Sequence, residues 1–175
     1  GCTISVKSKI GAGSVFYIKG EFDCVPAEQA AGAAPAAAAS RCEAALAGRH
    51  VLLCEDHPLN QEIAKALLQE KGLVVSVAED GREAVRLFGN SAPGFYDLIL
   101  MDIRMPVMDG YEATQAIRAL DRADAATVPI VAMTADAFAD DVKKCLELGM
   151  NGHIAKPIDP ELLFRKITAV LRPGK

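Results

Sequence analysis

Short apolar runs alternate with stretches of helical periodicity over the last two thirds of the chain. A run of four to six mostly apolar residues is typical of a strand that is covered on both faces, whereas apolar residues three or four positions apart are typical of an amphipathic helix. The pattern therefore predicts a repeated strand–helix unit. The five expected strands are Arg49–Cys54, Leu73–Ala78, Tyr96–Met101, Val128–Met133 and Gly152–Ala155.

A helix is expected after each of these strands. Pro58 suits the first turn of the first helix, and Asp159 followed by Pro160 suits the start of the last one, while Gly72 and Gly149 stand where helix C-caps are expected. Five such units predict an α/β fold, a doubly wound parallel sheet with helices on both faces. The apolar positions expected to share a helix face are Leu59, Ile63 and Leu67; Ala84, Val85 and Phe88; Ala113, Ile117 and Leu120; Val142, Cys145 and Leu146; and Leu163, Ile167, Val170 and Leu171.

The N-terminal quarter of the chain has a different pattern. Residues 1–23 alternate between apolar and polar side chains around Gly11 and Gly13, which predicts a β-hairpin. Because a lone hairpin is marginally stable in water, this one is expected to belong to a larger sheet or to dock elsewhere. Residues 24–47 are rich in alanine, lack core periodicity and contain Pro35, so they are predicted to form a linker.

Polar side chains follow four of the predicted strands at the point where each strand ends. Glu55 and Asp56 follow the first strand, Asp102 the third, Thr134 the fourth and Lys156 the fifth. Because parallel strands end at one edge of a sheet, these groups are expected to form one cluster. Taken singly, the two acids and the threonine also suit helix caps, and the lysine suits an ordinary turn. Of these groups, a carboxylate at the end of a buried strand has the highest desolvation cost, so it is the one least expected without a function.

The expected cluster has the composition of a phosphoryl-transfer site. Three carboxylates at one edge repel one another unless a cation compensates them. Oxygen ligands suit Mg²⁺, and the main-chain carbonyl of Arg104 is expected to complete the ligand set of Glu55, Asp56 and Asp102. The ion would neutralise the site beside an incoming phosphoryl group. Asp102 is then expected to accept that group, with the ammonium and the hydroxyl of the cluster contacting its oxygens.

Composition and charge narrow the class of function. Of the 175 residues, 51% are hydrophobic and 24% are charged, which is typical of a globular protein. A net charge of −4 without a basic block argues against nucleic-acid binding. No apolar run approaches the ~20 residues of a membrane span, so no membrane contact is expected, and no signal-peptide pattern is present. The five cysteines lack a C-x-x-C pair and are predicted to be reduced thiols in the cytoplasm.

The polar strand ends lie within four longer stretches, VLLCEDHPLNQ, DLILMDIRMPVMDG, VPIVAMTADA and HIAKPID. Together these stretches resemble the receiver domain of two-component response regulators, and the resemblance covers residues 48–175. It implies a flavodoxin-like sheet of strand order 2-1-3-4-5 and a phosphohistidine as phosphodonor. The residue roles that it implies are Asp102 as phosphoacceptor, Glu55 and Asp56 as ligands of Mg²⁺ or Mn²⁺, Thr134 and Lys156 as phosphoryl contacts, and a cis peptide bond between Lys156 and Pro157.

The stretch GCTISVKSKIGAGSVFYIKGEF resembles the last two strands of the ATPase domain of sensor histidine kinases, through its G-x-G-S-x-F pattern. Because the nucleotide-binding helix and loops of that family are absent from the sequence, residues 1–23 are not expected to bind ATP. The order of kinase end, linker and receiver is that of a hybrid histidine kinase. The resemblance implies a histidine kinase dimerisation domain or a histidine phosphotransfer protein as partner. The chain is expected to be a cytoplasmic monomer or weak dimer that accepts phosphate and removes it again by autodephosphorylation, whether or not its parent kinase is membrane-anchored.

Two positions depart from the usual receiver pattern. Glu55 stands where many receivers have aspartate, and the added methylene still permits metal ligation. His153, three residues before Lys156, occupies a switch position that is often aromatic in the family. Two interpretations of this histidine stay open: a half-buried ring beside the last strand, or a group that titrates near neutral pH and moves with Thr134.

Two other functions share part of the pattern. A phosphatase of the haloacid dehalogenase type also uses an aspartate nucleophile with threonine, lysine and Mg²⁺. Its nucleophile lies on the first strand, however, and a second aspartate follows two residues later, where this chain has Arg104. A receiver that acts as a scaffold without phosphorylation is the other alternative. Such domains lose the phosphoacceptor, the acids or the lysine, and this chain keeps all of them.

Overall fold

The computed structural model of the chain describes residues 3–9, 13–19, 46–135 and 139–171. The chain divides into two units, residues 1–38 and 39–175. In the first unit, β1 (Thr3–Lys9) and β2 (Gly13–Lys19) pair antiparallel along their full length, which confirms the predicted hairpin. Residues 24–45 of the predicted linker lie outside the described residues, and the origin of the hairpin in a kinase ATPase domain stays a prediction.

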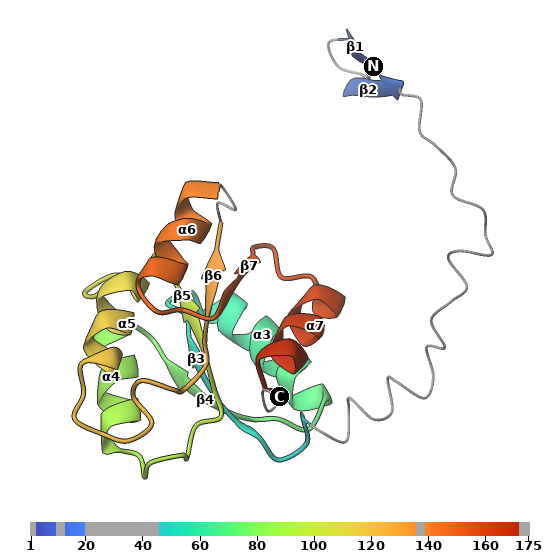
Figure 1. The fold of residues 1–175 in the computed structure, drawn as a ribbon. Coiled ribbons are helices and arrows are strands. Elements are labelled where there is room, and N and C mark those ends of the chain that lie inside the picture. Colours follow the sequence, from blue (N-terminus) through green and yellow to red (C-terminus); the bar gives the residue numbers. More distant parts are fainter. Residues whose placement is uncertain (1–2, 10–12, 20–45, 136–138, 172–175) are drawn as a thin grey trace, which may run out of the picture. The chain divides into compact units, whose positions relative to one another are not determined.

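The second unit is built on a parallel sheet of five strands (Figure 1). Their order across the sheet is β4-β3-β5-β6-β7, which confirms the expected order 2-1-3-4-5. Two strands end one residue later than predicted, so that the polar residues Asp102 and Thr134 are themselves the last residues of β5 and β6. The strands are β3 (His50–Cys54), β4 (Val74–Ala78), β5 (Leu98–Asp102), β6 (Ile130–Thr134) and β7 (Gly152–Ala155).

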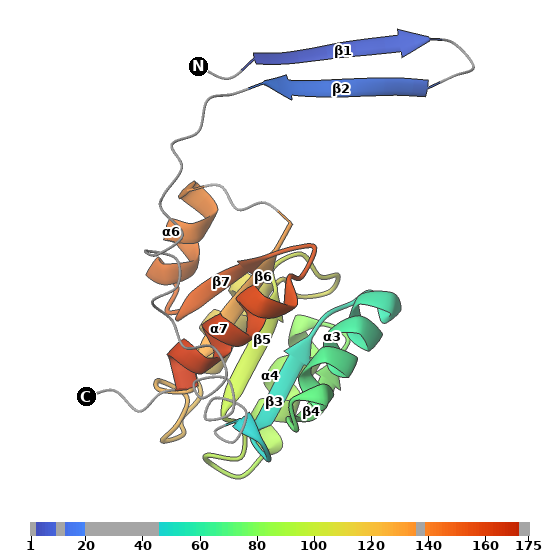
Figure 2. The same cartoon turned by 90° about the vertical axis from the view of Figure 1, so that its right-hand side faces the viewer.

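Helices cover both faces of this sheet, as the strand–helix alternation predicts. Figures 1 and 2 show α3 and α7 on one face and α4, α5 and α6 on the other. The helix starts agree with the sequence, because Pro58 and Pro160 each open a helix and Asp159 caps the second through the main-chain N–H of Leu162 at 2.9 Å. Their bounds are α3 (Pro58–Glu70), α4 (Gly81–Asn90), α5 (Gly110–Arg118), α6 (Ala139–Glu147) and α7 (Pro160–Leu171).

The strand residues divide alternately between two hydrophobic cores. On β3, Val51 and Leu53 pack on the side of α3 and α7, whereas Leu52 and Cys54 pack on the side of α4 and α5. The central strand β5 is buried at every position. A strand with both faces covered cannot alternate between polar and apolar residues, which explains why these strands appear as unbroken apolar runs in the sequence.

The predicted inner face of the first helix was wrong for two of its three residues, since Leu67 packs against the core but Leu59 and Ile63 do not. Leu59 and Ile63 are 62% and 49% exposed, and α3 instead buries Ala64 and Leu68 against the sheet. Because Ala64 and Leu68 occupy the inner side of the helix, Leu59 and Ile63 face solvent. On α6, Leu146 is likewise 55% exposed although the sequence placed it on the apolar face.

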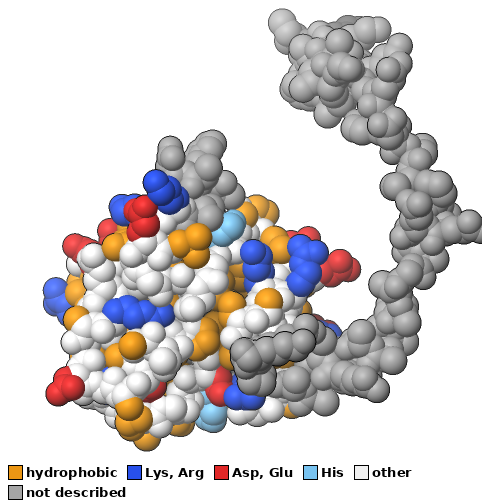
Figure 3. All heavy atoms as spheres, viewed as in Figure 1, with side chains coloured by type: hydrophobic (Ala, Val, Ile, Leu, Met, Phe, Trp, Pro, Cys, Tyr) orange, Lys and Arg blue, Asp and Glu red, His pale blue; other side chains and the backbone are white. Residues whose placement is uncertain are grey.

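The outer surface mixes charge types, and acidic and basic side chains are interspersed with apolar ones on the face drawn in Figure 3. Among the residues that the structure describes, no helix has both the length and the apolar character needed to cross a bilayer. Of the five cysteines, Cys54 is a buried free thiol, Cys145 is also buried, and the other three lie outside the described residues.

Gly110, the first residue of α5, lies against the end of the central strand. Its main-chain N–H donates to the carbonyl of Ile103 at 3.0 Å. A Cβ at this position would lie 2.2 Å from the carbonyl oxygen of Asp102, which is a main-chain atom of a buried strand. The close approach of helix and strand therefore requires glycine here.

We expect Gly110→Ala to lower the free energy of unfolding by about 1–3 kcal/mol, because the added methyl group must push the helix start away from Asp102. Urea denaturation followed by circular dichroism measures this change. Gly152→Ala is the matched control, since a Cβ at Gly152 meets nothing within 4 Å. Equal stability of the two variants would contradict the steric explanation.

Arg122 joins two loops at the end of the sheet where the strands begin. Its guanidinium binds the Asp124 carboxylate at 2.6 and 2.9 Å and lies 4.2 Å from the ring centre of Phe88. It also donates to the main-chain carbonyls of Phe88, Ser91 and Ala92. The hydrogen bond and charge of Arg122 lower the pKa of Asp124 to about 2.

We expect the stabilisation from this ion pair to be lost in acid. Because the pKa of Asp124 in the folded protein lies below the ~3.9 of an unfolded chain, its contribution is fully present above about pH 4 and disappears as the pH falls toward 2. The measurement is the free energy of unfolding of wild type and Asp124→Asn between pH 7 and pH 2. The difference between the two proteins should close at the acid end, and a constant difference would be inconsistent with this assignment.

Candidate functional site

The carboxyl ends of the parallel strands bring the predicted polar residues together. Glu55 directly follows β3, and it and Asp102 are 1% and 5% exposed. Thr134, at the end of the neighbouring strand β6, is 6% exposed. The main-chain N–H of Lys156 donates to the carbonyl of Thr134 at 2.7 Å, which fixes the lysine at the same edge. Residues separated by about a hundred positions in the sequence thus form one cluster.

The ammonium of Lys156 bridges the two buried carboxylates. Its Nζ lies 2.5 Å from Oε2 of Glu55 and 2.5 Å from Oδ2 of Asp102. The second oxygen of Asp102, Oδ1, accepts from the main-chain N–H of Arg104 at 3.1 Å. The peptide bond between Lys156 and Pro157 is cis, as the family resemblance implied.

Glu55 has two further partners, on the first turn of α3. Asn60 donates from Nδ2 to Oε1 of Glu55 at 2.8 Å, and Gln61 donates from Nε2 to the main-chain carbonyl of Glu55 at 2.7 Å. Every oxygen of the Glu55 carboxylate is therefore hydrogen-bonded. The sequence alone does not predict these contacts, and their only signal in it is a pair of amide side chains within the first turn of the helix that follows the acids.

The site is short of positive charge. Burial raises the pKa of Asp102, and the hydrogen bond and charge of Lys156 offset this only in part. For Lys156, burial lowers the pKa, but the hydrogen bonds to Asp102 and Glu55 outweigh burial and raise it. The lysine is therefore held as a cation, and one ammonium faces two buried carboxylates. Burying an uncompensated charge is costly, so the arrangement favours a further cation.

Asp56 completes a group of three acids. One carboxylate oxygen from each of Glu55, Asp56 and Asp102 lies within 4.8 Å of the others. Asp56 is exposed, whereas the other two are buried, so the group is open to solvent on one side. The ligand set is all oxygen and carries three formal charges against one lysine, which fits a hard divalent cation.

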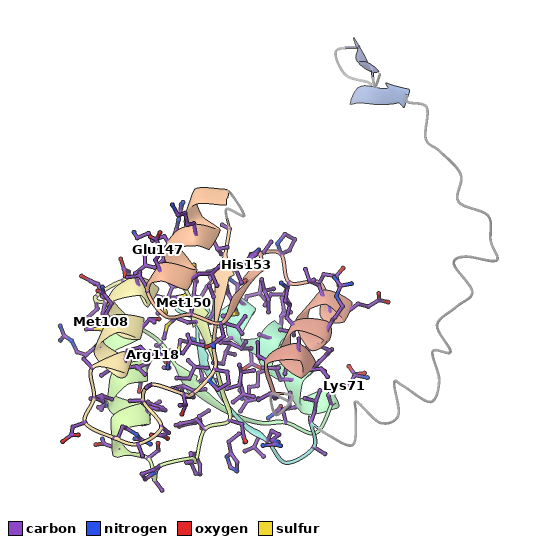
Figure 4. All side chains as sticks on the ribbon, in the orientation of Figure 1. Lys71, Met108, Arg118, Glu147, Met150 and His153 are labelled. Atoms are coloured by element: carbon purple, nitrogen blue, oxygen red, sulfur yellow. The ribbon has the colours of Figure 1, made fainter. Side chains whose placement is uncertain are left out.

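His153 lies on β7, opposite Ala132 of β6, and its side chain is partly buried (Figure 4). Burial lowers the pKa of its imidazole, and the charge of Lys166 lowers it further. Both effects favour the neutral ring, and the role of this histidine in a switch stays a prediction.

The chain is similar in sequence to proteins of a known family. Residues 51–168 match the family described as response regulator receiver domain. The chain is 41% identical over 119 residues to hybrid signal transduction histidine kinase I of Dictyostelium discoideum. It is 37% identical over 161 residues to histidine kinase 1 of Arabidopsis thaliana. These matches cover 67% and 74% of this chain but only 7% and 13% of the two kinases.

Solved structures show the same fold. The receiver domain of the sensor histidine kinase PA1611 from Pseudomonas aeruginosa, with magnesium coordinated in its active-site cleft, is 42% identical, with a TM-score of 0.65 over 73% of this chain and 100% of that one. A complex of the Saccharomyces cerevisiae histidine phosphotransfer protein Ypd1 with the receiver domain of Ssk1 matches at 32% identity, with a TM-score of 0.62 over 70% of this chain and 88% of that one. This chain therefore belongs to the response regulator receiver domain family and is similar to the receivers of hybrid histidine kinases.

Proposed function

We propose that the second unit of this chain is the phosphoacceptor of a two-component phosphorelay, with Asp102 as the residue that is phosphorylated. The observation that carries the proposal is a carboxylate buried at the end of the central strand, bound to Lys156 and accompanied by two further acids. A carboxylate oxygen of Asp102 would attack phosphorus, the bond from phosphorus to the imidazole nitrogen of a phosphohistidine would break, and the imidazole would take up a proton. The product is an acyl phosphate on Asp102.

Lys156 and Thr134 would stabilise the charge that the phosphoryl oxygens carry during transfer. Lysine supplies a compact positive charge on a flexible stem, and it already contacts the accepting carboxylate. Thr134 ends the neighbouring strand, whose Met133 pairs with Asp102. Movement of Thr134 and His153 toward the phosphoryl group would pass the signal to the outer surface of the domain, as in a population shift between two states.

The three acids and the main-chain carbonyl of Arg104 would hold the metal ion. Mg²⁺ is the first candidate because the ligands are all oxygen, and Mn²⁺ shares this preference. When bound, the ion supplies positive charge that offsets the carboxylates and the phosphoryl oxygens. The Pseudomonas receiver, with magnesium in its cleft, supports this assignment.

Exposed apolar side chains next to the site would receive the phosphodonor. Leu59 and Ile63 are exposed on α3, the helix whose Asn60 donates a hydrogen bond to Glu55. Val107 is 64% exposed on the loop that follows Asp102. Exposed apolar residues that gather at a functional site indicate a protein contact. We infer that the partner presents its histidine on a helix with an apolar face, and the complex of Ypd1 with a receiver domain supports a histidine phosphotransfer protein or the equivalent kinase domain.

We infer a reducing, cytoplasmic setting for this unit because Cys54 is a buried free thiol. That the chain is part of a longer kinase is inferred from its curated relatives. It matches only 7% and 13% of the length of the two kinases named above.

We expect incubation with acetyl phosphate and Mg²⁺ to add a single phosphoryl group to the chain. Intact-mass spectrometry measures the adduct, which should be absent from Asp102→Asn and from wild type in EDTA. An adduct that persists in Asp102→Asn would assign the phosphoacceptor to another residue. No adduct on a folded, Mg²⁺-binding wild-type chain would favour the scaffold alternative.

We expect Ile63→Glu to lower phosphotransfer from phosphorylated Ypd1 by about tenfold, because a charge in the centre of an apolar contact costs more than about 1 kcal/mol. Phosphorylation by acetyl phosphate should not change, since this small donor does not contact α3. Val74→Glu is the matched control, because Val74 is 46% exposed and lies at the start of β4, away from the strand ends that form the site. An equal loss of transfer in both variants would contradict docking on α3.

A further inference from the structure

Asn60 connects the first turn of α3 to the buried acid of the site. It is the third residue of a helix whose N-cap position is His57, so it does not cap that helix itself. Asparagine is a mediocre residue inside a helix, because its side chain competes for main-chain hydrogen bonds. Its amide instead donates to Oε1 of Glu55 at 2.8 Å. Asn60 is therefore unfavourable for the stability of the helix, but it makes a hydrogen bond to a carboxylate of the site.

The two oxygens of Glu55 have partners of different kinds. Oε2 accepts from the ammonium of Lys156 at 2.5 Å, and the same ammonium also contacts Asp102. Oε1 accepts from the neutral amide of Asn60. A cation that enters the acidic group competes electrostatically with the ammonium of Lys156, whereas it has no such conflict with the amide. We therefore expect the hydrogen bond from Asn60 to be present both with and without a bound cation.

A glutamate needs this support more than an aspartate does. The glutamate side chain has one additional rotatable bond, so ordering it costs conformational entropy. If the side chain were not already ordered, this cost would weaken cation binding. In this chain Glu55 is 1% exposed and already fixed at both oxygens. Gln61 fixes the main chain of the same residue at 2.7 Å but does not contact its carboxylate.

We propose that Asn60 is a positioning residue for the metal site, which holds the Glu55 carboxylate ready for a divalent cation. The inference rests on the proposed metal site and deepens it. Partners of this kind, which touch a ligand and not the metal, typically change metal affinity by about 10- to 100-fold when they are removed. Asn60→Ala is therefore expected to weaken Mg²⁺ binding by about tenfold, at the lower end of that range.

The test is calorimetric titration of the full chain with Mg²⁺, without any phosphodonor, on wild type, Asn60→Ala and Gln61→Ala. Gln61→Ala is the matched control, because it removes the neighbouring amide, which binds Glu55 only through the main chain. Asn60→Ala should lose the larger part of the affinity. Urea denaturation in EDTA shows whether each variant is folded and how much stability it has lost.

A double-mutant cycle with Glu55→Asp separates positioning from a general effect on the fold. Because an aspartate side chain is one methylene shorter, we expect it to fall short of the Asn60 amide. The loss of affinity from Asn60→Ala should then be much smaller in the Glu55→Asp background than in wild type. Equal losses in both backgrounds, or equal losses in Asn60→Ala and Gln61→Ala, would overturn the inference.

The same titration distinguishes this inference from the metal assignment beneath it. Wild-type affinity for Mg²⁺ in a folded Asn60→Ala variant would overturn the role of Asn60 alone. A wild-type chain that is folded and does not bind Mg²⁺ would overturn the proposed metal site and the role of Asn60 together.

Discussion

The contact on which the site depends is the bridge that Lys156 forms between two buried carboxylates. The ammonium lies 2.5 Å from both Glu55 and Asp102, and each of these acids ends or follows a strand in the middle of the sheet. Removing one partner of such a buried group leaves an uncompensated charge, which is strongly destabilising. One lysine nevertheless cannot neutralise two carboxylates, and the nearby Asp56 adds a third. The fold therefore holds its central strands together around a site that favours a further cation.

The main chain around Asp102 is as restricted as its side chain. Gly110 leaves no room for a methyl group beside the Asp102 carbonyl, and a Cβ at Gly81 would lie 2.5 Å from the carbonyl of Met108 on the same loop. That loop contains Val107, which adopts a positive φ of 68°. A β-branched residue in this region is strained, and such strain persists only where the surroundings impose it. The loop after Asp102 is therefore held between two helix starts.

Helix α3 serves the core, the site and the surface at once. Ala64 and Leu68 pack against the sheet, and Asn60 turns back to Glu55. Leu59 and Ile63, on the same helix, remain exposed. Because 3.6 residues complete one helical turn, the four-residue spacing places Asn60 on the same side as Ala64 and Leu68, and Leu59 and Ile63 on an adjacent side. A partner that docks on the apolar side would thus contact the element whose Asn60 holds the Glu55 carboxylate.

The sequence by itself determined the sheet, its strand order through the family resemblance, and the identity of Glu55, Asp56, Asp102 and Lys156 as strand-end residues. These were predictable because buried parallel strands are continuous apolar runs, and because their carboxyl ends meet at one edge. The tertiary structure decided which side of α3 faces inward. Leu59, Ile63 and Leu67 have the spacing of a core face, yet Ala64 and Leu68 occupy the inner side of the helix and Leu59 and Ile63 face outward. It also decided that Asn60 reaches Glu55, since hydrogen bonds between side chains depend on where a helix starts in space, and the order of residues alone does not fix this.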